Sequence, residues 1–200
     1  MNGKVCFFIG HRDTPEHVYP ALEQAVEQLI TQGVTEFYVG NHGSFDRMAA
    51  RAVIAAKQGH PQVRLTMLLA YHPGERLVTL PPGFDGSLYP PGMENVPRRF
   101  AIPRANRWMV EHCTHLVAYV THPASNAGKV VEWGRIQEKR VVELGESLAE
   151  EGLPIVWFRK LVRGEEREKI DQPAAAQNLR RFKQRKKESR VWGELRNVST

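Results

Sequence analysis

The sequence predicts an α/β protein built on a doubly wound parallel sheet of about five to six strands in three layers, with a basic C-terminal appendage. Two observations predict this class. Short apolar runs alternate with helical patterns along most of the chain, which is typical of parallel strands joined by crossover helices. The runs are continuously apolar, as in strands that are buried on both faces.

The first half of the chain is expected to contain three strands and two helices. The strands coincide with apolar runs at residues 5–9, 37–39 and 63–70. Thr14 as a cap and Pro15 at the first helical position open the first helix, which Gly33 ends. A second helix is expected to start at about Ser44, because apolar residues recur there at helical spacing.

In the second half, residues 71–97 interrupt this rhythm with six prolines. We expect a long loop there, either a functional lid or a disordered segment. Helical spacing returns over residues 104–112, and again from the turn at residues 121–128 to about residue 137. Further strands are expected at residues 116–120, at residues 141–144 and, at an edge position, at residues 155–158.

Charge divides the chain into two parts. Residues 159–200 hold 13 of the 28 Lys and Arg residues but 6 of the 22 Asp and Glu residues. We interpret residues 1–158 as the globular domain and residues 159–200 as a basic tail that is either partly helical or mobile. The globular domain is close to neutral, so the overall positive charge does not indicate that this domain binds nucleic acid.

Cysteine spacing and hydropathy set further expectations. Cys6 and Cys113 show no Cys-x-x-Cys spacing, so we expect two buried free thiols in a reducing compartment and no metal site. No signal peptide and no membrane-spanning stretch is predicted. We therefore expect a cytoplasmic protein.

Small and polar residues gather in the turns that follow the predicted strands. Parallel strands end at one edge of a sheet, where open α/β sheets bind ligands, so we expect these turns to line one pocket. The first turn holds Gly10, His11 and Arg12. Glycine lets the backbone approach a ligand, and a guanidinium binds phosphate through two parallel hydrogen bonds. The alternative is an exposed polar loop.

The second turn is the glycine-rich segment after the second strand. Gly40 and Gly43 allow backbone N–H groups to approach an anion at the start of a helix. Asn41 and Ser44 lie beside these glycines in the sequence. Asp46 either accepts from ribose hydroxyls or complements the helix dipole. The alternative is an ordinary turn before a helix.

A third turn leads into the last helix expected in the domain. Asn126, Gly128 and Lys129 offer a second anion site, and the lysine can itself bind phosphate. Glu132, one helical turn later, projects near the pocket in this interpretation. The alternative is a solvated carboxylate near a helix N-terminus.

Four motifs, in this order along the chain, resemble the SLOG superfamily. They are Phe-Ile-Gly-His-Arg at residues 8–12, Val-Gly-Asn-His-Gly-Ser-Phe-Asp at 39–46, Arg-Ala-Asn-Arg-Trp-Met-Val at 104–110 and Asn-Ala-Gly-Lys-Val-Val-Glu-Trp-Gly at 126–134. The resemblance covers about residues 4–145 and looks closest to the YpsA-like branch. This Rossmann-like superfamily includes the cytokinin-activating LOG phosphoribohydrolases and the Rossmann domain of DNA-processing protein A.

The resemblance implies a nucleotide pocket formed by the three turns together with Arg104 and Asn106, and it implies a homodimer. By similarity to the LOG enzymes, Glu132 would be catalytic and Arg104 would hold the substrate phosphate. The LOG turn Pro-Gly-Gly-x-Gly-Thr-x-x-Glu is changed, because residues 124–129 read Ala-Ser-Asn-Ala-Gly-Lys. The change keeps a nucleotide site and weakens the transfer of the hydrolase chemistry.

Three functional hypotheses follow. The leading one is a cytoplasmic protein that senses or handles a nucleoside phosphate or a ligand like NAD or ADP-ribose, with the nucleotide as its only expected bound group. The second is a hydrolase that cleaves the N-glycosidic bond of nucleoside 5′-monophosphates. The third is a nucleic-acid-binding protein of the DNA-processing type that uses the basic tail, which the near-neutral domain does not favour.

Overall fold

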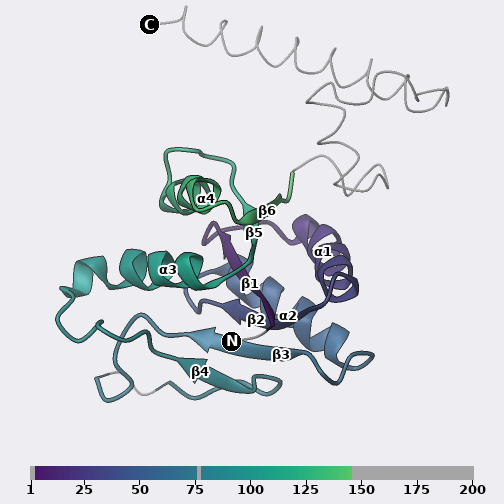
Figure 1. Ribbon diagram of the computed structural model, residues 1–200, viewed down its shortest axis with the longest axis horizontal. Helices are drawn as coiled ribbons and strands as arrows, with labels where there is room; N and C mark the ends of the chain where they lie inside the picture. Colours follow the sequence, from purple (N-terminus) through teal and green to yellow (C-terminus); the bar gives the residue numbers. More distant parts are fainter. Residues whose placement is uncertain (1–2, 76–77, 146–200) are drawn as a thin grey trace, which may run out of the picture. The chain divides into compact units, whose positions relative to one another are not determined.

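The protein's computed structural model describes residues 3–75 and 78–145. Six strands form one parallel sheet in the order β4-β3-β2-β1-β5-β6 (Figure 1). The strands are β1 Lys4–Gly10, β2 Val34–Val39, β3 Arg64–Leu68, β4 Gly86–Leu88, β5 His115–Tyr119 and β6 Arg140–Glu143. The helices are α1 Tyr19–Thr31, α2 Ser44–Lys57, α3 Ala101–His112 and α4 Asn126–Ile136. The predicted doubly wound α/β class is confirmed.

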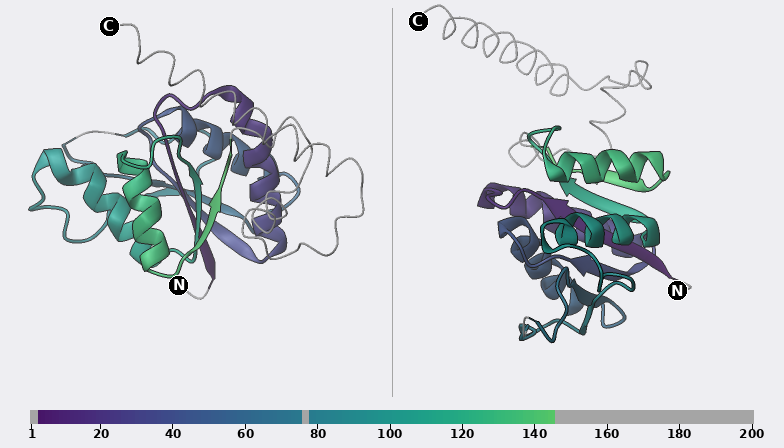
Figure 2. Two further views of the ribbon diagram at one scale, coloured as in Figure 1. Left: turned by 90° about the horizontal axis from the view of Figure 1, so that it is seen from above. Right: turned by 90° about the vertical axis from the view of Figure 1, so that its left-hand side faces the viewer.

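Strand β1 lies at the centre of the sheet and is covered on both faces. Helices α1 and α2 pack together on one face and α3 and α4 on the other (Figure 2). Successive side chains of a strand point to opposite faces, so Phe7 and Phe8 enter different layers, and both are almost fully buried. The chain runs outward from β1 to β4 and then returns to β5 on the other side of β1. The strand order therefore reverses between β1 and β5, where sheets of this kind bind ligands.

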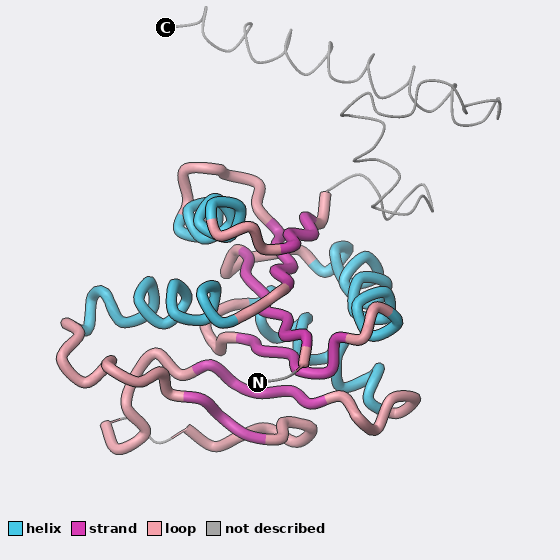
Figure 3. Tube along the Cα trace, viewed as in Figure 1, coloured by secondary structure: helices cyan, strands magenta, loops and turns pink. Residues whose placement is uncertain are grey.

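Strand β4 was not anticipated, because it lies inside the segment that we expected to be one long loop. It is three residues long and pairs with β3 at the sheet edge, amid the long connections that Figure 3 shows as loop. Asp85 joins it to the sheet: the Asp85 carboxylate accepts from the Leu65 N–H at 2.7 Å and from Lys57 Nζ at 2.6 Å. So short a strand has no sequence periodicity and depends on these long-range contacts. Residues 155–158 and 159–200, expected as an edge strand and a basic tail, lie outside the described residues.

The start of the first helix differs from the sequence expectation. Residues Glu16–Val18 form a 3-10 turn, and α1 begins only at Tyr19 with Pro20 in its first turn. The prediction that Thr14 caps this helix is wrong, because its hydroxyl donates to the His11 carbonyl at 2.7 Å. Thr14 is buried, and it thus holds the loop after β1 in a compact form.

Candidate ligand pocket at the switch point

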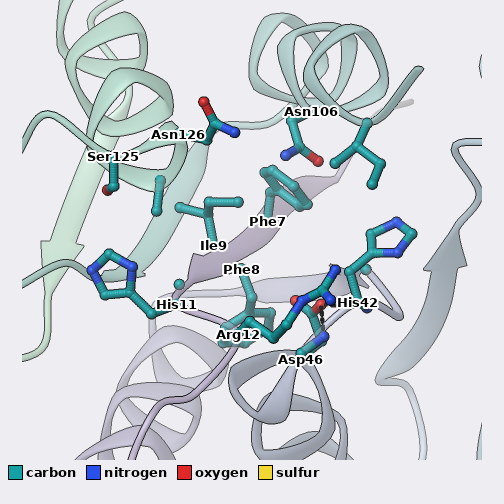
Figure 4. Close-up of a pocket in the computed structure, with 15 residues that line it drawn as sticks. Phe7, Phe8, Ile9, His11, Arg12, His42, Asp46, Asn106, Ser125 and Asn126 are labelled. Carbon is teal, nitrogen blue, oxygen red and sulfur yellow. Dashed lines mark hydrogen bonds between the residues drawn. The ribbon is translucent and has the colours of Figure 1, made fainter. Parts of the chain in front are cut away.

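A pocket of about 270 Å³ lies where the strand order reverses, at the carboxyl ends of the strands. In Figure 4, Asn106 and Asn126 lie across the pocket from Arg12, His42 and Asp46. Three turns and the first part of α3 contribute its walls. The lining residues are Phe7, Phe8, Ile9, Gly10, His11, Arg12, Gly40, His42, Gly43, Asp46, Ile102, Asn106, Ser125, Asn126 and Ala127.

The turn after β1 contains His11, which joins two loops, and Arg12, which carries a positive charge. Nε2 of His11 accepts from the Thr121 N–H at 3.0 Å, and this bond joins the loops that follow β1 and β5. The Arg12 carbonyl accepts from the Ser44 N–H at 2.7 Å and from the Ser44 hydroxyl at 2.8 Å. Within the described ranges, the guanidinium of Arg12 makes no hydrogen bond or ion pair. Arg12 thus brings an uncommitted positive charge to the pocket.

The glycine-rich turn after β2 already holds an anion of its own. The Asp46 carboxylate accepts from the N–H groups of His42 at 2.8 Å and Gly43 at 3.2 Å. Burial raises the pKa of the Asp46 carboxyl, and these hydrogen bonds oppose that shift. The Ser44 N–H also has an acceptor, as described above. Three successive N–H groups that we expected to cradle a phosphate are therefore occupied within the chain.

The N-terminus of α4 has backbone N–H groups without an acceptor in the described part of the chain, which the turn after β2 lacks. Ser125 caps this helix, its hydroxyl accepting from the Gly128 N–H at 3.1 Å. The preceding N–H groups of Asn126 and Ala127 have no acceptor among the residues that the structure describes, and the first turn of α4 carries no acidic residue. Free N–H groups and the positive end of the helix dipole favour an anion. Since Asn126 and Ala127 line the pocket, this end of α4 opens into it.

Gly128 makes this turn possible without touching the pocket. A Cβ atom at this position would lie 2.1 Å from the Pro123 carbonyl oxygen, far closer than any side chain tolerates. Only glycine lets the first turn of α4 pass so close to the preceding backbone. Gly128 therefore shapes the turn, and the direct ligand contact that the sequence suggested for it stays a prediction.

A second cavity adjoins the first. This groove, also about 270 Å³, is lined by Ile102, Pro103, Asn106, Arg107, Asn126, Lys129, Val130 and Trp133. Ile102, Asn106 and Asn126 line both cavities, so the two lie side by side. The guanidinium of Arg107 lies 4.2 Å from the centre of the Trp133 ring.

The structure brings most of the expected site residues together. Eight of them line the pocket: Gly10, His11, Arg12, Gly40, Gly43, Asp46, Asn106 and Asn126. Lys129 lines the adjoining groove. Asn41 is exposed outside both cavities, and the Ser44 hydroxyl donates to the carbonyls of Arg12 and Thr14 instead of facing a ligand.

The two residues expected to be catalytic lie elsewhere. Glu132 is exposed, with its side chain 64% accessible, and accepts from Arg135 at 3.2 Å. Helical geometry explains this placement, because Val131 faces the core and the next residue is rotated by about 100° toward solvent. Arg104 is likewise exposed and lines neither cavity. Neither residue therefore lines the pocket in this structure, and the catalytic roles expected for them stay predictions.

Some lining residues had no role assigned from the sequence. Ser125 opens the third turn, and its capping role follows from serine before a helical pattern, the usual N-cap signal. Arg107 belongs to the same motif as Asn106, and only packing shows that its side chain lies over Trp133. His42 carried no signal that separates it from an ordinary turn residue.

Residues 3–75 and 78–145 contain no group of three or more His, Cys, Asp or Glu side chains that could hold a metal ion. Cys6 and Cys113 are buried free thiols, as expected, and burial raises the pKa of Cys113 to about 12. None of the described helices has the length and hydropathy to cross a membrane.

No family model and no curated protein matches this chain. Several solved structures share its fold. DNA processing protein A (DprA) from Streptococcus pneumoniae superimposes with a TM-score of 0.54 at 18% identity, over 80% of this chain and 56% of that chain. DprA from Helicobacter pylori, whose single-stranded DNA binding mode has been studied, gives 0.52 at 13% identity, over 82% of this chain and 81% of that chain.

Moco carrier protein from Chlamydomonas reinhardtii is another neighbour, with a TM-score of 0.50 at 15% identity, over 82% of this chain and 97% of that chain. Both kinds of neighbour share the Rossmann-like α/β fold of this chain, which agrees with the predicted fold class. At these identities the likeness establishes the fold alone. This chain spans 56% of the length of the pneumococcal DprA.

Proposed function

We propose that this protein binds a small phosphate-bearing ligand, a nucleoside phosphate or a compound like NAD or ADP-ribose, in the pocket at the switch point. One observation carries the proposal: the N-terminus of α4 opens into the pocket with two N–H groups free of acceptors, and the guanidinium of Arg12 lines the same pocket. Free N–H groups and a guanidinium together suit a phosphate group.

The fold neighbours support a binding role of this kind. Moco carrier protein, by its name, carries a small-molecule cofactor. The match to this fold covers 97% of its chain. The pocket here lies where parallel α/β sheets hold ligands in general. We expect the protein to act in the cytoplasm, and the SLOG resemblance adds the expectation of a homodimer, which light scattering of the purified protein can measure.

Calorimetry tests the proposal directly. The full-length protein is titrated with nucleoside monophosphates, NAD, ADP-ribose and ribose 5-phosphate. We expect at least one of these to bind and Arg12→Ala to weaken that binding about tenfold, because a hydrogen-bonded charge pair with phosphate contributes about 1.5–3 kcal/mol.

Arg140→Ala is the matched control, since Arg140 is an exposed arginine at the opposite, amino-terminal end of a strand. It is expected to bind like the unaltered protein. Absence of binding for the whole panel, together with an unchanged thermal midpoint in its presence, would refute the proposal.

A second candidate is binding of single-stranded nucleic acid, and a specific surface feature favours it. Phe100, just before α3, is 51% exposed. The guanidinium of Arg99 lies 4.8 Å from the centre of the Phe100 ring, and Arg98 precedes Arg99 in the sequence. Exposed aromatic rings with neighbouring arginines bind unpaired bases and phosphates. The DprA neighbour from Helicobacter pylori binds single-stranded DNA by its description.

This candidate predicts salt-sensitive binding of an oligonucleotide that Phe100→Ala weakens. Leu80→Ala, which removes another exposed apolar side chain, serves as control. Fluorescence anisotropy with labelled oligonucleotides at several salt concentrations measures both variants. Equal affinities for the two variants would exclude Phe100 as a contact.

A further inference from the structure

We infer that the groove between α3 and α4 is the subsite that receives the planar heteroaromatic ring of the ligand whose phosphate binds at the N-terminus of α4. The inference rests on the proposed function and assigns the ring of that ligand to a particular place. The groove is the cavity defined above by Ile102, Pro103, Arg107, Lys129, Val130 and Trp133, together with the shared Asn106 and Asn126.

The volumes of the two cavities indicate that neither alone encloses a nucleotide-sized ligand. Pockets that enclose small-molecule ligands usually measure about 300–1,000 Å³, whereas the pocket and the groove each measure about 270 Å³. Asn106 and Asn126 line both cavities, so a ligand that extends from the pocket into the groove passes these two side chains. A nucleotide-sized ligand therefore occupies both cavities, with its phosphate near Asn126.

The walls of the groove suit an aromatic ring. Ile102, Pro103 and Val130 provide apolar surface, and Trp133 provides a large ring. No carboxylate is among its lining residues, whereas Arg107 and Lys129 are both cationic. Apolar surface bordered by cations favours an electron-rich ring attached to an anionic group. The pocket, by contrast, contains the Asp46 carboxylate.

Arg107 shows how the ring is held. Its guanidinium lies 4.2 Å from the centre of the Trp133 ring, and its Nε donates to Glu111 at 3.3 Å. A flat heterocycle can stack on the exposed face of this guanidinium or displace it and stack on Trp133. The indole N–H of Trp133 is buried and has no hydrogen-bond partner among the described residues.

The test compares a ligand with a ring to one without. AMP, GMP, CMP, UMP and NAD are titrated against the full-length protein alongside ribose 5-phosphate. We expect the tightest nucleotide to lose about tenfold in affinity in Arg107→Ala, since stacking on arginine or an aromatic ring is a strong contribution to base binding. The affinity for ribose 5-phosphate should not change.

Arg51→Ala is the matched control. Arg51 stacks on Tyr19 at 4.3 Å and pairs with Glu16, as Arg107 does with Trp133 and Glu111, but it lies outside both cavities. Arg51→Ala should leave the affinities for the nucleotide and for ribose 5-phosphate unchanged. A second readout uses intrinsic fluorescence: nucleotide binding should change the tryptophan emission, and Trp133→Phe, which keeps an aromatic ring in place, should remove most of that change.

The outcomes separate the two proposals. If the nucleotide binds Arg107→Ala and Trp133→Phe as tightly as the unaltered protein, the groove is not the ring subsite although the phosphate site stands. If no nucleotide binds more tightly than ribose 5-phosphate, the inference fails in the same way. If neither ribose 5-phosphate nor any nucleotide binds, the proposed function fails, and the inference falls with it.

Discussion

The turn before α2 and the turn before α4 look alike in sequence and differ in what they leave open. Each brings small residues to the start of a helix at the carboxyl edge of the sheet, with Gly43 as the N-cap of α2 and Gly128 in the first turn of α4. In the first, the carboxylate of Asp46 folds back onto the N–H groups of His42 and Gly43. In the second, no acidic side chain does so, and the N–H groups of Asn126 and Ala127 remain open toward the pocket.

A glycine-rich turn is therefore an anion site only if the chain does not provide the anion itself. An aspartate at the third helical position can stabilise the helix and can also close the site to phosphate. Asp46 does both. The turn before α2 is thus a rigid wall of the pocket. The turn before α4 is its binding end.

The largest effect is expected from a substitution that prevents the turn before α4 from forming. Gly128→Ala places a Cβ atom 2.1 Å from the Pro123 carbonyl, so we expect a loss of about 3 kcal/mol in the free energy of unfolding, the range of strongly strained backbone sites. Urea denaturation measures this. Gly86→Ala is the control, because a Cβ atom at Gly86 meets nothing within 4 Å.

Removing the internal anion from the other turn should have the next largest effect. Asp46→Ala leaves the N–H groups of His42 and Gly43 without an acceptor, and we expect a loss of about 2 kcal/mol in stability. Asp46→Asn keeps an amide oxygen that can accept, so its loss should be much smaller. If both substitutions cost the same, the hydrogen bonds of the carboxylate are not what holds this turn.

Asp46→Asn also changes the pH dependence. The raised pKa of the folded carboxyl means that the folded state keeps a proton after the unfolded state has released it. The free energy of unfolding therefore falls as pH rises from the ordinary aspartate pKa through the raised value. Denaturation curves across this window should show a shallower fall for Asp46→Asn, and the variant should bind phosphate ligands more tightly because the pocket has lost its carboxylate.

Removing the cap of α4 tests its N-terminus more gently. Ser125→Ala deletes the acceptor of the Gly128 N–H, and we expect a loss of about 1 kcal/mol in stability. Ligand affinity should fall as well, because the free N–H groups of this turn become less well ordered. Ser125→Asp, which can still cap, should recover stability but repel a phosphate, so the two measurements should diverge.

The smallest effect is expected at Glu132. Its exposed side chain contacts Arg135 and lines neither cavity, so Glu132→Gln should leave ligand affinity unchanged. The same variant tests the hydrolase hypothesis when nucleoside monophosphates are incubated with the protein and free base is measured. Base release by the unaltered protein that disappears in Glu132→Gln would restore a catalytic role to this residue.

Much of the fold could be read from the sequence, because buried parallel strands and amphipathic helices leave local signatures. The apolar run of β1 and the helical spacing of α2 lie where the sequence predicted them. The convergence of the three turns also followed from the sequence, since parallel strands end at a common edge. Strand β4 could not be predicted, because a three-residue strand is defined by its pairing with β3 alone.

For the site, the sequence determined which turns meet, and the tertiary structure decided what each of them can still bind. Asp46 could equally have faced a ligand or its own helix, and the choice depends on where His42 and Gly43 direct their N–H groups. Glu132 could have faced the pocket, and the rotation of α4 turned it to solvent. Composition and spacing are local, whereas the direction of a side chain depends on the packing of residues far apart in the chain.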